Sequence, residues 1–173
     1  MIDRLKPNGV LPLFLGWRYA KLQLEFTGGP FDFYPAFAIA QENDNAYGVC
    51  VRAERVTKAL SPDVHLPIRD FSVPENPAAV AGALTAALSA AIDGKRVYIG
   101  CMGGWGRTGL FMALLVKAAG IENPVEYVRV NYTPRAVETE EQERYVENFD
   151  VSTIQKALAW QAWKARFKRL FRL

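Results

Sequence analysis

The sequence predicts an α/β fold with a single, largely parallel central sheet flanked by helices on both faces. Short apolar or β-branched runs, such as residues 96–100, alternate with longer segments typical of helices. Glycines stand where the predicted strands and helices end and the chain must turn. The chain has 173 residues, half of them hydrophobic, which is enough to bury one core.

Residues 1–46 are the hardest part of the chain to assign. Gly, Pro and aromatic residues alternate there with short apolar runs, as in residues 27–35, which predicts short strands and turns. The apolar run at 10–17 is broken by Pro12 and lacks a small-residue cleavage site. We therefore interpret it as a strand or a segment packed on the core, not as a signal peptide.

The remaining elements follow in order along the chain. Strands are expected at residues 47–51 and 64–68, and a loop with two prolines at 69–77. An Ala-rich helix is expected to begin at Pro77 and to end near residue 92, because Asp93-Gly94 follows. The apolar run at 96–100 predicts a buried strand. A helix that follows this strand is expected to end near residue 119, before Gly120. Three more helices are expected at residues 124–132, 138–149 and 152–171.

Charge divides the chain into a body at residues 1–150 and a basic, amphipathic C-terminal helix at 151–173, part of the domain or appended to it. The whole chain has a net charge of +3, and all six charged residues after Asp150 are basic. The body, residues 1–150, therefore has a net charge of −3. A nucleic-acid-binding body is therefore not expected. We expect the tail aromatics, Trp160 to Phe171, to pack on the body, with peripheral contact to a membrane or a partner as the alternative.

The cysteine content indicates a reducing compartment. Two cysteines, Cys50 and Cys101, are too few for a disulfide framework, and no stretch is long enough to span a bilayer. We expect a soluble, cytoplasmic protein. His65 is the only histidine, so a metal site is not expected, and Cys50 is interpreted as a core residue.

The segment from Cys101 to Gly109 carries the chemistry. A strand, a glycine-rich turn and a helix start turn successive N–H groups inward and form an anion cradle. A positive environment favours the thiolate of Cys101 as nucleophile. Arg107 is expected to hold phosphoryl oxygens, and Thr108 to donate its hydroxyl to the sulfur. The predicted substrate-binding residues are Met102, Gly103, Gly104, Trp105, Gly106 and Arg107.

This C-x5-R-[ST]-G pattern resembles the signature of the protein tyrosine phosphatase superfamily. Met-Gly-Gly-Trp-Gly inside it is most similar to the dual-specificity and kinase-associated branch. The resemblance implies a cysteine-phosphatase-like fold that hydrolyses phosphate monoesters through a phosphocysteine intermediate, without metal or cofactor. Phosphotyrosine, phosphoserine or phosphothreonine in proteins would be the substrate. The absence of Lys from the loop disfavours phosphoinositides.

The resemblance also implies a general acid about thirty residues before the cysteine. Asp70 lies 31 residues upstream and is the expected acid, with Asp63 as its competitor. Residues 135–149 resemble the superfamily's glutamine-bearing segment, in which Gln142 would position the hydrolytic water. Glu138 stands where that segment has its first glutamine. A helix cap by Thr139 and Gln142 is the alternative interpretation.

Gly100 is the main departure from the resemblance, because the superfamily has His before the nucleophile. This departure leaves open a catalytically weak pseudophosphatase that binds phosphorylated partners. A sulfurtransferase or arsenate reductase also uses an anion loop with cysteine, but the Gly-Arg-Thr-Gly ending and Asp70 speak against it.

Overall fold

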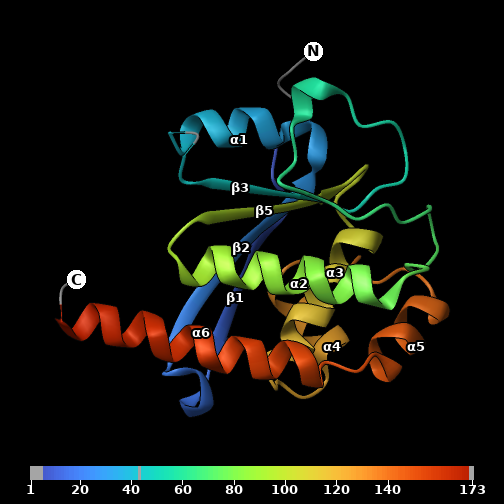
Figure 1. The fold of residues 1–173 in the computed structure, drawn as a ribbon. Coiled ribbons are helices and arrows are strands. Elements are labelled where there is room, and N and C mark those ends of the chain that lie inside the picture. The colour runs from blue at the N-terminus through green and yellow to red at the C-terminus, as the bar shows by residue number, and fades with distance from the viewer. Residues whose placement is uncertain (1–5, 43, 172–173) are drawn as a thin grey trace.

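A computed structural model describes residues 6–42 and 44–171 (Figure 1). Five strands form one sheet in the order β1-β2-β5-β3-β4. Only β1 and β2 pair antiparallel; the other three pairings are parallel, as predicted. The strands are β1 (Gly9–Leu15), β2 (Leu22–Pro30), β3 (Ala46–Cys50), β4 (Val64–His65) and β5 (Arg96–Cys101).

The central strand β5 separates two apolar cores. Val97 and Ile99 point into the larger core, which α2 (Pro77–Ile92) and α3 (Gly106–Ala118) cover. Tyr98 points to the opposite face, because side chains alternate along a strand. There it joins a smaller, aromatic cluster with Phe31 and Tyr34 under α1 (Tyr34–Ala40). The predicted arrangement of helices on both faces is therefore correct, although one face carries most of them (Figure 1).

Three further helices complete the larger side. These are α4 (Pro124–Asn131), α5 (Glu140–Asn148) and α6 (Ser152–Phe171). Helices α4 and α5 pack on α3, and α6 packs on α2 (Figure 1). Single 3-10 turns lie at η2 (Trp17–Tyr19), η3 (Phe31–Phe33) and η4 (Lys58–Leu60). No helix in the described ranges has the length and hydropathy needed to cross a bilayer.

The helix with the clearest sequence signals forms as predicted. Helix α2 begins at Pro77, and the side chain of Asn76 accepts hydrogen bonds from the N–H groups of Ala78 and Ala79 at 3.0 and 3.2 Å. This cap satisfies two donors that have no partner inside the helix. The helix ends at Ile92, and Gly94 turns the chain with φ of +92°.

Three expectations need correction. The strand expected at 64–68 ends at His65, and residues 34–40 form a helix that the turn-like sequence hid. Helix α6 does not pack its aromatics on the body: its buried residues are Ile154, Leu158 and Ala162, while the rings of Trp160, Trp163, Phe167 and Phe171 are exposed. The inner face of α6 carries the aliphatic side chains, which are smaller than the aromatic rings and let the helix approach α2 closely.

Candidate active site

The cysteine loop, residues 101–107, connects β5 to α3 and places one backbone N–H group against the sulfur. The Cys101 N–H donates to Thr108 Oγ1 at 2.9 Å, and the Gly104 N–H donates to Cys101 Sγ at 3.2 Å. Thr108 thus contacts the backbone of Cys101, and its donation to the sulfur stays a prediction.

Contacts from distant segments hold the outer side of this loop. The Tyr132 hydroxyl donates to the Gly104 carbonyl at 2.5 Å, and the Asn8 side-chain amide donates to the Gly103 carbonyl at 2.8 Å. Burial raises the pKa of Tyr132 far above its usual value, so its hydroxyl keeps the donated proton. Gly104 has φ of +78°, and a Cβ there would collide with the backbone of Gly29. The loop is therefore fixed against β2.

Close packing explains why position 100 is a glycine in this chain. A Cβ at this position would lie 2.6 Å from the Gly29 carbonyl oxygen and 2.9 Å from the Phe31 Cα. Both are backbone atoms, which cannot move aside cheaply. Any larger residue before the nucleophile would push β5 and the end of β2 apart.

Arg107 is anchored by two acidic residues and a carbonyl. Its side chain is 3% exposed; Nη1 donates to Glu54 Oε2 at 2.6 Å and to the Ile68 carbonyl at 3.0 Å. Burial would lower the pKa of Arg107, but the contact with Glu54 and the nearby charges raise it overall. The same hydrogen bond lowers the pKa of Glu54 below its usual value. The guanidinium is therefore fixed and charged.

Asp70 lies on the opposite wall, in the segment of residues 69–76 that we name the acid loop. Its Oδ1 is 3.0 Å from Arg107 Nη2, and its side chain is 57% exposed. A cavity of about 220 Å³ separates the two loops. It is lined by Asp70, Phe71, Cys101, Met102, Gly103, Trp105, Gly106, Arg107 and Glu138. The structure thus brings the predicted nucleophile, arginine and acid to one cavity.

The competitor Asp63 lies elsewhere. Its carboxylate accepts hydrogen bonds from the Gly48 N–H at 2.7 Å and from the Tyr34 hydroxyl at 3.1 Å. These contacts join β3 to the aromatic cluster under α1. The geometry therefore favours Asp70 as the acid.

Gln142 is fully buried and ties α5 to the acid loop. Its Nε2 donates to the Ser72 carbonyl at 3.1 Å, and its Oε1 accepts from the Glu138 N–H at 2.9 Å. Its own N–H donates to Thr139 Oγ1 at 3.2 Å, which confirms the predicted N-cap. The returning half of the capping box ends one residue earlier than expected, on Glu138. Both ends of the amide engage backbone, and Gln142 does not line the cavity.

The rim of the cavity carries charges of both signs. The Glu138 carboxylate lies so close above Gly106 that a Cβ on the glycine would overlap it. The Arg135 guanidinium stacks on Trp105, 3.9 Å from the ring centroid. An anion entering the cavity therefore meets the negative charge of Glu138.

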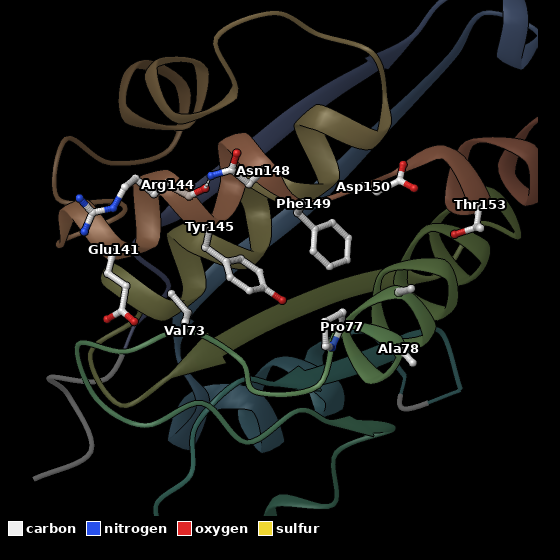
Figure 2. Close-up of a pocket in the computed structure, with 11 residues that line it drawn as sticks. Val73, Pro77, Ala78, Glu141, Arg144, Tyr145, Asn148, Phe149, Asp150 and Thr153 are labelled. Atoms are coloured by element: carbon white, nitrogen blue, oxygen red, sulfur yellow. Dashed lines mark hydrogen bonds between the residues drawn. The ribbon is translucent and has the colours of Figure 1, made fainter.

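A second cavity, of about 720 Å³, lies behind the acid loop (Figure 2). Figure 2 shows the rings of Tyr145 and Phe149 reaching from α5 toward Pro77 at the start of α2, with Val73 of the acid loop beside them. The lining is mostly apolar. The acid loop thus has open space on both sides.

Other candidate residues have structural contacts. Within the described ranges no three His, Cys, Asp or Glu residues gather into a possible metal site. His65 Nε2 lies 2.8 Å from the Arg52 carbonyl oxygen, and burial raises the pKa of the Cys50 thiol. Glu54, Asn8 and Tyr132 could not be predicted from the sequence, because they reach the loop from distant segments without a recognisable spacing.

Two curated proteins are similar to part of this chain in sequence. Two uncharacterised proteins of Methanocaldococcus jannaschii are each 40% identical over 87 residues, 49% of this chain. The match covers 57% and 53% of those proteins, so it spans a little over half of their length.

Two solved structures share the fold. The structure of Tk-PTP in its active form has a TM-score of 0.57 at 24% identity, over 84% of this chain and 96% of that one. Kinase associated phosphatase, with its catalytic-site cysteine replaced by serine, has a TM-score of 0.60 at 18% identity, over 83% and 94%. At these identities the likeness establishes the fold.

A family model places the chain more closely. The model described as "Swiss Army Knife protein, DSP-PTPase phosphatase domain" matches residues 52–157, more than half of the chain. This stretch contains the acid loop, the cysteine loop and α5. The chain therefore belongs to this PTP-SAK family of dual-specificity and tyrosine phosphatase domains.

Proposed function

We propose that the chain hydrolyses phosphate monoesters through a phosphocysteine intermediate on Cys101. The observation that carries this proposal is the single cavity lined by Cys101, Arg107 and Asp70. Residues 1–150 would form the phosphatase-like body, with α6 attached to it. A reducing cytoplasm would keep the thiol of Cys101, a free cysteine, available.

In the first step the Cys101 thiolate attacks phosphorus, so an S–P bond forms while the ester P–O bond breaks. Arg107 holds two phosphoryl oxygens, and one of them takes the Nη2 contact that Asp70 now makes. The carboxylic acid form of Asp70 gives its proton to the leaving oxygen. The N–H groups of residues 102–107 bind the remaining charge.

In the second step water attacks the phosphocysteine. The S–P bond breaks, inorganic phosphate leaves, and the Asp70 carboxylate takes a proton from the water. Thr108, next to Cys101, would donate to the sulfur as it leaves. Gln142 would act in this step by positioning water, or by holding the acid loop through Ser72.

We propose a phosphorylated protein as substrate, with phosphotyrosine as the first candidate and phosphoserine or phosphothreonine as the others. Phe71 and Trp105 line the cavity and offer apolar walls to an aromatic ring. A phosphotyrosine peptide is therefore expected to have a higher kcat/KM than the matched phosphoserine peptide.

Hydrolysis of an aryl phosphate in the presence of a chelator tests this function. The wild type should be active, and Cys101→Ser should lose at least about 1,000-fold in kcat because the oxygen nucleophile is not ionised at neutral pH. Cys50→Ser is the matched control and should keep its activity. Chelator-sensitive activity that survives Cys101→Ser would refute the mechanism.

A pseudophosphatase that binds phosphorylated partners is the second candidate. Glu138 favours it, because its carboxylate lies above the loop that would bind the phosphate. Absence of turnover in the wild type, with tungstate binding that Arg107→Ala abolishes, would support this candidate instead.

A further inference from the structure

Helix α6 has two apolar faces, and the body covers only one of them. The inner face buries Ile154, Leu158 and Ala162 against α2, η2 and α3. At 100° per residue the opposite face carries five large apolar side chains. These are Trp160, Trp163, Phe167, Leu170 and Phe171, each between 55 and 68% exposed.

The outer face forms one continuous stripe. The rings of Phe167 and Phe171 contact each other, with centroids 4.5 Å apart and ring planes tilted by 40°. Together the five side chains are nearly half of the large hydrophobic residues exposed in the described ranges. An exposed apolar patch of this kind, edged by polar groups, is typical of an interaction surface.

Basic side chains flank the stripe on both sides. The Lys164 ammonium lies 4.7 Å from the Trp160 ring centroid, and the Arg166 guanidinium 5.7 Å from that of Trp163. Lys156 and Lys168 are also exposed. The chain has no acidic residue after Asp150, whereas residues 1–150 carry a net negative charge. The surface is therefore complementary to an anionic partner.

We propose that the outer face of α6 binds the surface of an anionic lipid bilayer. Trp and Phe suit the depth of the headgroups, and flanking Lys and Arg contact lipid phosphates. A groove on a partner protein could also bind the apolar stripe, but such binding would not require basic residues along both edges of the stripe. The helix would lie in the plane of the surface, because it is too polar to cross the membrane.

The position of the stripe leaves the cavity open. The cysteine loop lies at the carboxyl end of β5, while α6 contacts η2, which precedes β2 at the opposite end of the parallel strands. In Figure 1 the C-terminal end of α6 also lies away from the loop between β5 and α3. Bound in this way, the protein would act at the membrane with its cavity facing the aqueous side.

Co-sedimentation of the full chain with vesicles tests the proposal and does not depend on phosphatase activity. The wild type should bind vesicles of 30% phosphatidylglycerol in phosphatidylcholine at low salt. It should bind vesicles of pure phosphatidylcholine much more weakly. The triple variant Lys164→Glu/Arg166→Glu/Lys168→Glu should reduce the partition coefficient at least about ten-fold, because each basic residue near such a surface contributes about 1 kcal/mol.

A second variant separates apolar insertion from charge. Trp160→Ser/Trp163→Ser/Phe167→Ser should also lose binding, whereas Ile39→Ser, which removes an exposed apolar side chain on α1, should not. Circular dichroism and aryl phosphatase activity serve as controls for folding. No binding of the wild type to anionic vesicles, or unchanged binding in both triple variants, would overturn the proposal. If the wild type forms dimers and does not bind vesicles, and only the serine variant is monomeric, the stripe is a contact between copies of this chain.

Discussion

The cysteine loop and the acid loop face each other across one cavity but are built in opposite ways. The cysteine loop is packed so closely that neither Gly100 nor Gly104 has room for a Cβ, and Tyr132 and Asn8 hold it from outside. The acid loop has a cavity on each side and an exposed aspartate. Phe71, next to that aspartate, has a φ of +55°, which is strained for an aromatic residue.

The two loops would divide the chemistry between them, with the nucleophile on the rigid loop and the acid on the other. A nucleophile and an arginine that must meet phosphorus in line gain from a rigid support. An acid that gives a proton to varied leaving groups gains from a loop that can move.

After the loss of the nucleophile itself, the largest effect on kcat is expected from removing the acid. Asp70→Asn should lower kcat for phenyl phosphate at least about 100-fold, because the leaving oxygen then departs without a proton. The loss should be smaller for p-nitrophenyl phosphate, whose leaving group needs less protonation. Asp63→Asn makes the same change outside the cavity and should keep full activity. Equal losses in the two variants would remove Asp70 from its proposed role.

The packing of the cysteine loop predicts a large loss of stability. Gly100→Ala should lower the free energy of unfolding by roughly 1–3 kcal/mol in urea titrations, because its Cβ meets the backbone of Gly29 and Phe31. Gly82→Ala is the matched control. Its Cβ points into open space on α2, so it should be neutral or stabilising. A wild-type stability for Gly100→Ala would contradict the packing explanation.

The tether from Gln142 to Ser72 is expected to have a moderate effect. Gln142→Met removes the hydrogen bond at nearly constant volume and should lower kcat up to about ten-fold, the value of one hydrogen bond. In an Asp70→Asn background the same substitution should have little further effect, if it acts by placing the acid. Full additivity of the two losses would show that Gln142 acts elsewhere, for example on water. Gln155→Met, which loses a hydrogen bond to the Ala118 carbonyl, is the control.

Glu138 is expected to have the smallest effect, and in the opposite direction. Glu138→Gln should lower the Ki of inorganic phosphate about five-fold, since one unit charge near an exposed site contributes about 1 kcal/mol. The gain should shrink as salt is added. Glu141→Gln, three residues further along the chain in the first turn of α5, lines the second cavity and should leave the Ki unchanged. An unchanged Ki in Glu138→Gln would mean that this carboxylate turns away when phosphate binds.

The sequence predicted the part of the site that is local in the chain. Cys101, the glycines and Arg107 lie within seven residues, and the glycines that form the turn are the same ones that shape the anion cradle. Asp70 was found through the resemblance, because its distance from Cys101 is the only signal it carries. Glu54 and Tyr132 contact the loop from other elements, and no pattern along the chain reports such contacts.

The fold shows the same limit. Helix α2 has a cap, a proline start and a glycine stop, and it begins at the predicted Pro77 and ends at Ile92, close to the expected position. In α6 the sequence offers two apolar faces, and the more hydrophobic one was expected to be buried. Packing depends on how closely a face approaches its neighbour, so Leu158 and Ala162 are inside and Trp160 is outside.

The glycine contact between β2 and the cysteine loop also bears on where the domain begins. The family match starts at residue 52, after β1, β2 and β3 have ended. A fragment cut at that residue would leave β5 without either of its neighbours and the cysteine loop without Asn8 and Gly29. The stretch by which the chain is recognised is therefore smaller than the set of elements that pack around β5. A module grafted into another protein must carry the N-terminal strands with it.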